Sequence, residues 1–498
     1  MVTMSQQQSF NTLTEPWIPV LKDDMSIVEV SLGDAVLNAH LYKFVAAENP
    51  IVNASLYRLL VTFLSRACNI NSKNRLLELW KQKQICSQDI DKYIFKWKNR
   101  FDVFDPDVPF FQNVSSAEEV KFFVKKNVHP VHRLFFVGET SRTYFVHVSD
   151  ADASNRQYDH ARIVRLLISS QQYAISAGRG YRKSLSFTSG GIYLLEGKNL
   201  LETLLLNSAA ATSRNNSDDK PCWEEDVGYF RSSKSVPSGF YSTLTWLVVR
   251  QKLLPNWQYL KRDKNGRKID YTHIDPFSIV LPGSNKKPVT LKCNTGNFWK
   301  DFHSFLSQHE TSRGNNNTGL MALRQLPFDI LNERKPSIAC FGMDASNSEI
   351  KSWREDHYSM PLSIVDKELS SDLESLVGVA AKAERAMYSV FLSTCKNSSS
   401  RKSMIKRYIE KTNEAFYWTP LEDEFWGNVR IIEEKARNGS EDEIEDLIKT
   451  TKERWRKLVL GLIESCIAKV AASRNIDPKL YFMTDGILHQ FRKKIKNV

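Results

Sequence analysis

The stretch LSSDLESLVGVAAKAERAMYSVF, residues 369–391, decides the fold of the C-terminal part of the chain. Its apolar residues recur at steps of three or four, or at multiples of these, which is the period of one face of an α-helix. A second run near the end of the chain repeats this spacing. The apolar positions are Leu369, Leu373, Leu376, Val377, Ala380, Met387 and Phe391 in the first run, and Trp455, Leu458, Val459, Leu462, Cys466 and Val470 in the second.

Short polar segments divide this region. Residues 397–400 are rich in Ser and Asn, residues 438–440 hold Gly and Ser, and Pro420 and Pro478 are expected to mark further breaks. Four helices in up-and-down order account for about 130 residues. The sequence therefore predicts a four-helix bundle over residues 366–498, with a domain boundary near residue 365.

Upstream of that boundary the pattern is mixed. Residues 9–45 are typical of short strands and turns, whereas residues 51–67 and 161–176 have the apolar spacing of helices. Over residues 240–345 short apolar runs alternate with Gly, Pro and Asn, which indicates strands and loops. The expected fold class is α+β: a large mixed N-terminal domain over residues 1–365, followed by the C-terminal bundle.

The loop RFDVFDPDVPFFQ, residues 100–112, contains two prolines that exclude a helix. Its phenylalanines Phe104, Phe110 and Phe111 are expected to anchor the loop in the core, because aromatic side chains are mostly buried.

The net charge of the 498-residue chain is +12, with a pI near 9.1, which favours a polyanionic partner such as nucleic acid. A merely basic soluble protein is an equally good interpretation of the composition alone. Residues 366–498 hold 24 Lys and Arg against 21 Asp and Glu, a net charge of +3, which leaves +9 for residues 1–365. The net charge of each part is thus roughly proportional to its length, and no single tail carries it. A basic surface for nucleic acid therefore has to form from residues that folding brings together. Local basic clusters occur at residues 121–133, 260–268, 398–411 and 491–496.

The seven cysteines form no C-x-x-C pair, which argues against a zinc ribbon and against a disulfide framework. No apolar signal core and no run of 18 or more apolar residues occurs. We expect a soluble, cytoplasmic protein with no membrane association.

Known catalytic patterns are missing from the sequence. It has no G-x-x-x-x-G-K-[ST] loop, no H-E-x-x-H pair and no G-x-S-x-G elbow. His129 and His132, or His147 and His160, are weak candidates for metal ligands because no carboxylates stand at ligand spacing. The sequence argues for binding and not for catalysis, with no metal and no cofactor.

Two glycine-containing stretches are candidates for binding. Residues 176–183, SAGRGYRK, combine Gly178 and Gly180, which allow close backbone approach, with basic side chains suited to phosphate. The alternative is an ordinary helix cap at Gly178. Residues 341–353, FGMDASNSEIKSW, place small polar residues at the tip of a turn that can reach a partner, with a plain solvated turn as the alternative.

The order of five motifs resembles a known family. They are FNTLTEPWIPV (10–20), RFDVFDPDVPFFQ (100–112), LLISSQQYAISAGRGYRKSL (166–185), VPSGFYSTLTWLVVR (236–250) and GMDASNSEIKSWRED (342–356). Together they resemble the large subunit of the type I-E CRISPR Cascade, the CasA family. The resemblance extends from about residue 10 to the end of the predicted bundle.

The resemblance implies a non-enzymatic subunit of an RNA-guided complex, with the CRISPR RNA, other Cascade subunits (backbone, small and handle-binding) and double-stranded target DNA as partners. Such a subunit recognises the protospacer-adjacent motif (PAM) from the minor groove, opens the duplex to start R-loop formation and helps to recruit a helicase-nuclease. The family's wedge corresponds to Ser346, Asn347 and Ser348, and its glycine loop to residues 177–181, with Gly178, Arg179, Gly180 and Tyr181. Its groove-reading lysine corresponds to Lys264, with Lys261 or Lys268 as replacements.

Further family contacts are assigned to basic side chains. Loop 113–160 corresponds to the region that touches the guide handle, and the bundle is implied to dock on neighbouring subunits and to help hold displaced DNA. The handle candidates are Lys121, Lys125, Lys126, His129 and Arg133, and the bundle candidates for phosphate are Arg401, Lys402, Lys406 and Arg407.

This chain departs from the family pattern in three respects. Asn347 stands where some relatives have a glutamine, which implies a different motif preference. Arg179 lies between the two loop glycines and adds a possible phosphate or narrow-groove contact. The cysteine pairs of some relatives are absent.

Two other functions compete with this interpretation. A nuclease would need a metal cluster of carboxylates or histidines, which the sequence does not contain. A nucleic-acid-binding scaffold without sequence preference would bind duplexes that differ only at the motif equally well.

Overall fold

The computed structural model of the chain describes most of the sequence. The described residues are 9–113, 128–130, 159–173, 191–213, 218–226, 237, 239–247, 251–253, 258–261, 275–282, 288–291, 299, 320–334, 336–346, 349–359, 367–394, 399–473 and 478–495. The chain divides into two compact units: Met1–Asn294 with Ser304–Met360, and Thr295–His303 with Pro361–Val498. The predicted boundary near residue 365, as a boundary between functional domains, stays a prediction.

The first unit begins with a small antiparallel sheet, built of the short strands that the sequence predicted over residues 9–45, whereas the helix in this range (Leu32–Leu37) was not predicted. The strand order of this sheet is β2-β1-β3. The elements are β1 (Ile18–Lys22), β2 (Ile27–Val30), helix α1 (Leu32–Leu37), a 3-10 turn (Ala39–Leu41) and β3 (Tyr42–Val45). Ser31 caps α1 by accepting a hydrogen bond from the Asp34 amide.

Helix α2 (Pro50–Ala67) is the centre of this unit. Asn49 caps it by accepting hydrogen bonds from the amides of Ile51 and Val52, and proline occupies the first helical position, where its missing N–H is not needed. The sequence predicted one buried face, but every residue from 51 to 65 is buried. The polar positions tolerate burial because side chains such as Ser55 donate to the carbonyl four residues earlier.

One charge lies inside α2. The Arg58 side chain is 2% exposed, and its guanidinium lies 2.9 Å from the carboxylate of Asp275, which is 3% exposed. Arg58 also donates to the carbonyl oxygen of Thr243 at 3.2 Å. Both partners come from segments almost 200 residues or more further along the chain, so this ion pair ties the middle of α2 to later parts of the unit.

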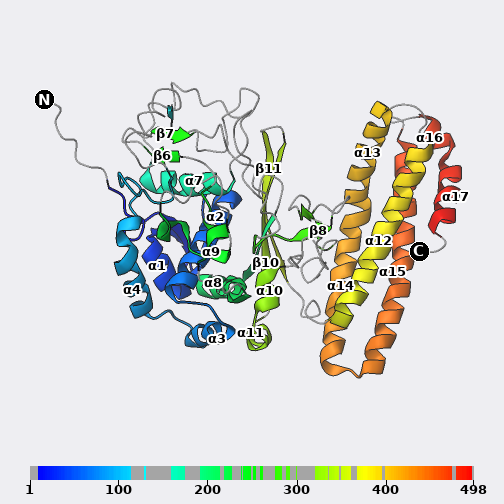
Figure 1. Cartoon of the computed structure of the whole chain (residues 1–498). Coiled ribbons are helices and arrows are strands. Elements are labelled where there is room, and N and C mark those ends of the chain that lie inside the picture. Colours follow the sequence, from blue (N-terminus) through cyan, green and yellow to red (C-terminus); the bar gives the residue numbers. More distant parts are fainter. Residues whose placement is uncertain are drawn as a thin grey trace. The chain divides into compact units, whose positions relative to one another are not determined.

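Helices α7 and α8 pack on α2, as Figure 1 shows, and further helices and strands complete this unit. The helices are α3 (Lys73–Gln82), α4 (Ser87–Trp97), α7 (His160–Gln172), α8 (Leu200–Ser208), α9 (Phe240–Leu244), α10 (Met321–Gln325) and α11 (Phe328–Glu333). Short 3-10 helices cover Lys98–Arg100, Ala209–Ser213 and Cys222–Glu224. The strands are β4 (Val128–Pro130), β5 (Gly191–Glu196), β6 (Gln251–Leu253), β7 (Gln258–Lys261), β8 (Val280–Pro282), β9 (Pro288–Thr290), β10 (Ser337–Ser346) and β11 (Glu349–Ser359). They form antiparallel sheets of order β11-β10-β5, β4-β7-β6 and β8-β9.

The phenylalanines of loop 100–112 are anchored as predicted. Phe110 and Phe111 are buried, and Phe110 stacks on Phe101 with ring centroids 4.8 Å apart. Phe104 is only half-buried and packs edge-on against His160, the first residue of α7.

The second unit is helical, which confirms the α+β class with a C-terminal helical bundle. Its elements are α12 (Lys367–Thr394), α13 (Ser399–Asn413), a π-helical turn (Glu414–Trp418), α14 (Thr419–Asn438), α15 (Glu441–Ala472), α16 (Pro478–Phe482) and α17 (Thr484–Ile495). Ser440 and Glu443 form a capping box at the start of α15, where the Gly/Ser break was predicted.

The break predicted at Pro420 is wrong. Helices α13 and α14 run through this proline as one continuous rod, joined by the π-helical turn (Figure 1). A π-turn accommodates the proline because it shifts the hydrogen bonds by one residue: Thr419 donates its amide and its hydroxyl to the carbonyl of Glu414, five residues back.

An aromatic cluster holds the bundle together. Trp299, which belongs to this unit although it precedes the bundle by almost 70 residues, is fully buried. Its ring lies 5.5 Å from that of Trp418, 5.0 Å from Phe425 and 6.0 Å from Trp455. The Trp455 ring nitrogen donates to the carbonyl of Leu376 in α12 at 2.7 Å, so the cluster links α12, α14 and α15.

We predict that Asp275→Ala lowers the free energy of unfolding by about 3–5 kcal/mol, because it leaves the Arg58 charge buried without its partner. Urea unfolding of the full chain followed by tryptophan fluorescence measures this change. The control is Asp23→Ala, which removes an exposed carboxylate 3.8 Å from Lys43 and is expected to cost at most about 1 kcal/mol. Equal effects of the two substitutions would contradict the role assigned to the buried pair.

Candidate nucleic-acid interface

The predicted wedge lies at the end of a β-hairpin. Strands β10 and β11 pair in antiparallel register from Ser337 with Ser359 to Ser346 with Glu349. Asn347 and Ser348, the two residues between the last paired positions, lie outside the described residues, and only the backbone of Ser346 is described. A plain solvated turn over the whole of 341–353 is wrong, because Phe341 and Met343 are buried strand residues.

The hairpin extends beyond its neighbouring strand. β5 pairs with β10 only from Ser337 to Gly342, so among the described strands the segment from Met343 to Ser346 pairs with β11 alone. Four residues of strand span about 13 Å. A register shift between Asp344 and Ala345 leaves Lys351 of β11 without an opposite residue, and a bulge of this kind bends and twists a hairpin.

Charged side chains fix the base of the hairpin. His357 in β11 lies with Nδ1 2.9 Å from Glu196 of β5 and with Nε2 3.4 Å from Glu355. Glu355 in turn accepts a hydrogen bond from Asn53 of α2 at 3.0 Å, and Tyr57 of α2 packs against Phe341 of β10 with ring centroids 6.0 Å apart. The hairpin is therefore held by its base, whereas its other end carries the candidate residues.

The predicted glycine loop follows α7. Residues 177–181, including Gly178, Arg179, Gly180 and Tyr181, lie outside the described residues, and α7 ends at Gln172, four residues earlier than the predicted helix. Asp159 caps the start of α7 by accepting from the Ala161 amide.

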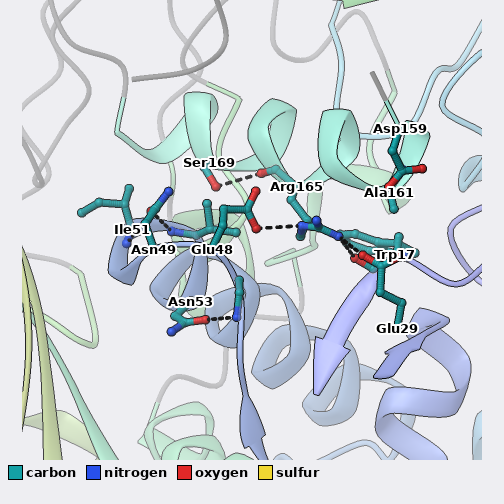
Figure 2. A network of polar contacts seen from close by, with 12 residues as sticks. Trp17, Glu29, Glu48, Asn49, Ile51, Asn53, Asp159, Ala161, Arg165 and Ser169 are labelled. Carbon is teal, nitrogen blue, oxygen red and sulfur yellow. Dashed lines mark hydrogen bonds and ion pairs between the residues drawn. The ribbon is translucent and has the colours of Figure 1, made fainter. Parts of the chain in front are cut away.

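Arg165 anchors α7 to the N-terminal sheet, as Figure 2 shows. Its side chain is 9% exposed and lies 2.7 Å from Glu29 of β2 and 3.0 Å from Glu48. It also donates to the carbonyl oxygen of Trp17 at 2.8 Å. Three acceptors from three segments fix this helix, which is the part of the described structure that leads into the glycine loop.

The predicted lysine region follows β7. Lys261 ends this strand and pairs through its backbone with Gln251 of β6, whereas Lys264 and Lys268 lie outside the described residues. The buried Gln251 side chain donates to the carbonyl of Leu167 and accepts from Ser170, both in α7, at 3.1 and 3.0 Å. The elements that lead into the glycine loop and into the lysine region are thus joined through one glutamine.

Most candidates for the guide handle lie outside the described residues, namely Lys121, Lys125, Lys126 and Arg133. His129 lies in β4, where its backbone pairs with Tyr259 of β7. This places the segment after Lys126 and the strand that ends at Lys261 in the same sheet.

The bundle candidates lie on α13. Lys402, Lys406 and Arg407 are exposed, and only the backbone of Arg401 is described. The Lys406 ammonium lies 4.0 Å from the carboxylate of Glu410, four residues further along the helix.

Neither a metal centre nor a membrane segment is found in the part of the chain that the structure describes. Within those residues no three His, Cys, Asp or Glu side chains are grouped to hold a metal ion. No described helix is long and apolar enough to cross a membrane.

Arg165, Gln251 and His357 were not among the sequence candidates. Each supports a candidate segment through at least one partner that lies 81 residues or more away in the sequence. A basic residue within an apolar helical period was the available signal for Arg165, because such a charge needs a buried partner.

The contacts with Glu196 and Glu355 raise the pKa of His357 to about 10, because both carboxylates hydrogen-bond to the ring and favour its charged form. The charged ring therefore stabilises the fold fully below the unfolded pKa, about 6.5, and this contribution is lost as the pH rises toward 10. We predict that His357→Ala lowers Tm most at pH 6 and progressively less up to pH 10. A decrease in Tm that does not change with pH would contradict this role.

Comparison with known proteins identifies the family. The family model described as CRISPR-associated protein Cse1 matches residues 11–462. CRISPR-associated protein CasA/Cse1 of Thermus thermophilus is 24% identical over 446 residues, which cover 85% of this chain and 86% of the relative.

Solved structures share the fold. A structure of Thermus thermophilus CasA (Cse1) matches with a TM-score of 0.71 and 20% identity, covering 99% of this chain and 100% of the other. Cse1 from Acidimicrobium ferrooxidans has a TM-score of 0.67 and 18% identity, covering 99% and 98%. A chain of a CRISPR RNA-guided surveillance complex has a TM-score of 0.67 and 15% identity, covering 98% and 100%. Since the family model spans most of the sequence, the chain belongs to the CRISPR-associated Cse1 family, the CasA large subunits that its motifs predicted.

Proposed function

We propose that this chain is the non-catalytic subunit of an RNA-guided CRISPR interference complex that recognises the motif flanking the target sequence in double-stranded DNA. Family membership supports a role in CRISPR interference. One similar chain is part of an RNA-guided surveillance complex, which supports a CRISPR RNA and other Cascade subunits as partners.

The observation that carries the motif-reading role is the form of the β10–β11 hairpin. Its base is fixed to β5 and α2 through His357 and Glu355. Among the described strands, its far segment, from Met343 to Ser346, extends past the end of β5 and pairs with β11 alone. A wedge needs such a mount, since separating a base step costs roughly a few kcal/mol that groove contacts have to offset. We assign the wedge to Ser346, the last residue of this segment, and to Asn347 and Ser348, which follow it directly.

Two further segments are assigned to the same duplex. The loop after α7 brings Gly178 and Gly180 to the minor groove, and one lysine between residues 261 and 268 reads a groove edge. The minor groove has a degenerate pattern of donors and acceptors, so contacts there accept several related motifs. Support for a common site comes from Gln251, which joins the elements preceding both segments.

The remaining assignments concern binding without sequence preference. Lys121, Lys125, Lys126 and Arg133 contact the guide handle, and the exposed cations of α13 contact backbone phosphates of displaced DNA. The complex then recruits a separate helicase-nuclease to degrade the target. A scaffold subunit without motif preference is the alternative, favoured only by the net charge of +12.

We predict that Asn347→Ala and Gly180→Asp each abolish most of the discrimination between flanking motifs. The amide of Asn347 supplies the wedge contact, and a carboxylate at position 180 repels phosphate. The measurement is binding of the reconstituted complex to target duplexes with a randomised flanking motif. Binding to a single-stranded target, which needs guide pairing alone, is expected to be unchanged.

Two control variants sharpen this experiment. Asn74→Ala removes an exposed amide in α3 and is expected to change nothing. Lys402→Glu with Lys406→Glu weakens binding to all duplexes alike and lowers its salt dependence, because phosphate contacts carry no sequence information. If all variants keep the motif preference of the wild type, the wedge assignment is refuted; if the wild type has none, the scaffold function replaces it.

A further inference from the structure

The end of α4 and the 3-10 helix after it form a surface that none of the assignments above uses. The segment KYIFKWKNR, residues 92–100, contains four basic and three aromatic residues and no carboxylate. Ile90 lies buried on the inner side of α4. Lys92, Phe95, Lys96 and Lys98 are exposed, and we call these four residues the α4 patch.

Phe95 is unusual in its exposure. Its side chain is 76% exposed, so it contributes almost nothing to the core. The Lys98 ammonium lies over its ring, 5.4 Å from the centroid, and the Lys96 ammonium lies over the ring of Trp97 at 5.0 Å. A cation over the face of an aromatic ring is attracted by the negative charge of that face. These contacts hold positive charge beside an aromatic face that is still accessible to a ligand.

The lysines of the patch are not committed to carboxylates. Helix α4 contains two carboxylates, and Asp89 is paired with Arg75 of α3 at 2.8 Å, which leaves Asp91. Among the described residues, Lys92, Lys96 and Lys98 form no ion pair. Arg100 is different, because it donates to the carbonyl oxygen of Glu225.

We propose that the α4 patch binds an unpaired segment of nucleic acid, with a base stacked on Phe95 and the adjacent phosphates on Lys92, Lys96 and Lys98. Cationic side chains select a polyanion, and an exposed aromatic ring selects an unpaired base, whose face is free to stack. In a duplex the base faces are already stacked on one another. None of the four residues belongs to the segments assigned to motif reading, and the α4 patch is proposed independently of that assignment.

Binding of labelled oligonucleotides to the full chain tests the proposal. The probes are an oligodeoxythymidine and an oligouridine of equal length, and their binding is measured by fluorescence anisotropy. The oligonucleotide that binds with the higher affinity indicates whether the patch binds DNA or RNA. Phe95→Leu, which keeps an apolar side chain but removes the π-face, is expected to weaken binding by at least about fivefold. Phe95→Trp is expected to retain or strengthen it.

Charge and position provide two further readouts. Neutralising the three lysines together, Lys92→Gln, Lys96→Gln and Lys98→Gln, is expected to reduce the slope of log affinity against log salt by about 0.7 for each phosphate that a lysine no longer neutralises. Phe328→Ala, which removes a phenylalanine that is 70% exposed in α11, is the matched control and is expected to bind like the wild type.

The proposal fails if the wild type binds neither oligonucleotide, or if Phe95→Leu binds as tightly as the wild type. It also fails if Phe328→Ala weakens binding as much as Phe95→Leu does. In these cases the exposed ring is a surface for another protein or has no ligand.

Discussion

The packing of the first unit around α2 depends on the buried ion pair between Arg58 and Asp275. This pair permits a helix with a charge at its centre to be buried on all sides, because the guanidinium is matched by a carboxylate at 2.9 Å and by the Thr243 carbonyl. Without a partner, such a charge would oppose burial by several kcal/mol. Once α2 is in place, Asn53 and Tyr57 provide a fixed surface for the β10–β11 hairpin.

The same constraint connects the fold to the proposed site. Helix α7 packs on α2 and is held by Arg165, and it reaches β6 and β7 through Gln251. The segments assigned to the wedge, the glycine loop and the lysine region therefore continue from elements that connect to one buried helix, directly or through one or two neighbouring elements. The proposed function requires such a frame, because reading a groove from several positions needs rigidly mounted segments.

Sequence analysis predicted the elements that have a strong local period. The helices over residues 51–67 and 369–391 are present, and so are the capped break before α15 and the buried phenylalanines of loop 100–112. It failed at Pro420, because a π-helical turn precedes the proline, which lies in the first turn of α14, and the helix continues through it. It also gave no sign that Trp299 packs into the bundle, since contacts with Trp418, Phe425 and Trp455 leave no local pattern.

For the candidate site, the sequence identified the binding segments but not the residues that hold them in place. The sequence singled out residues 176–183 and 341–353 through their glycines and small polar residues, and the family resemblance assigned roles to residues 177–181 and 346–348 within them. The residues that mount these segments, such as Arg165 and His357, act through partners more than 100 residues away in the sequence.

The most direct test of the account is photo-crosslinking from position 347 in the reconstituted complex bound to target DNA. The account predicts crosslinks to the base pairs of the flanking motif, whereas crosslinks spread evenly along the duplex, or none to DNA, would contradict it.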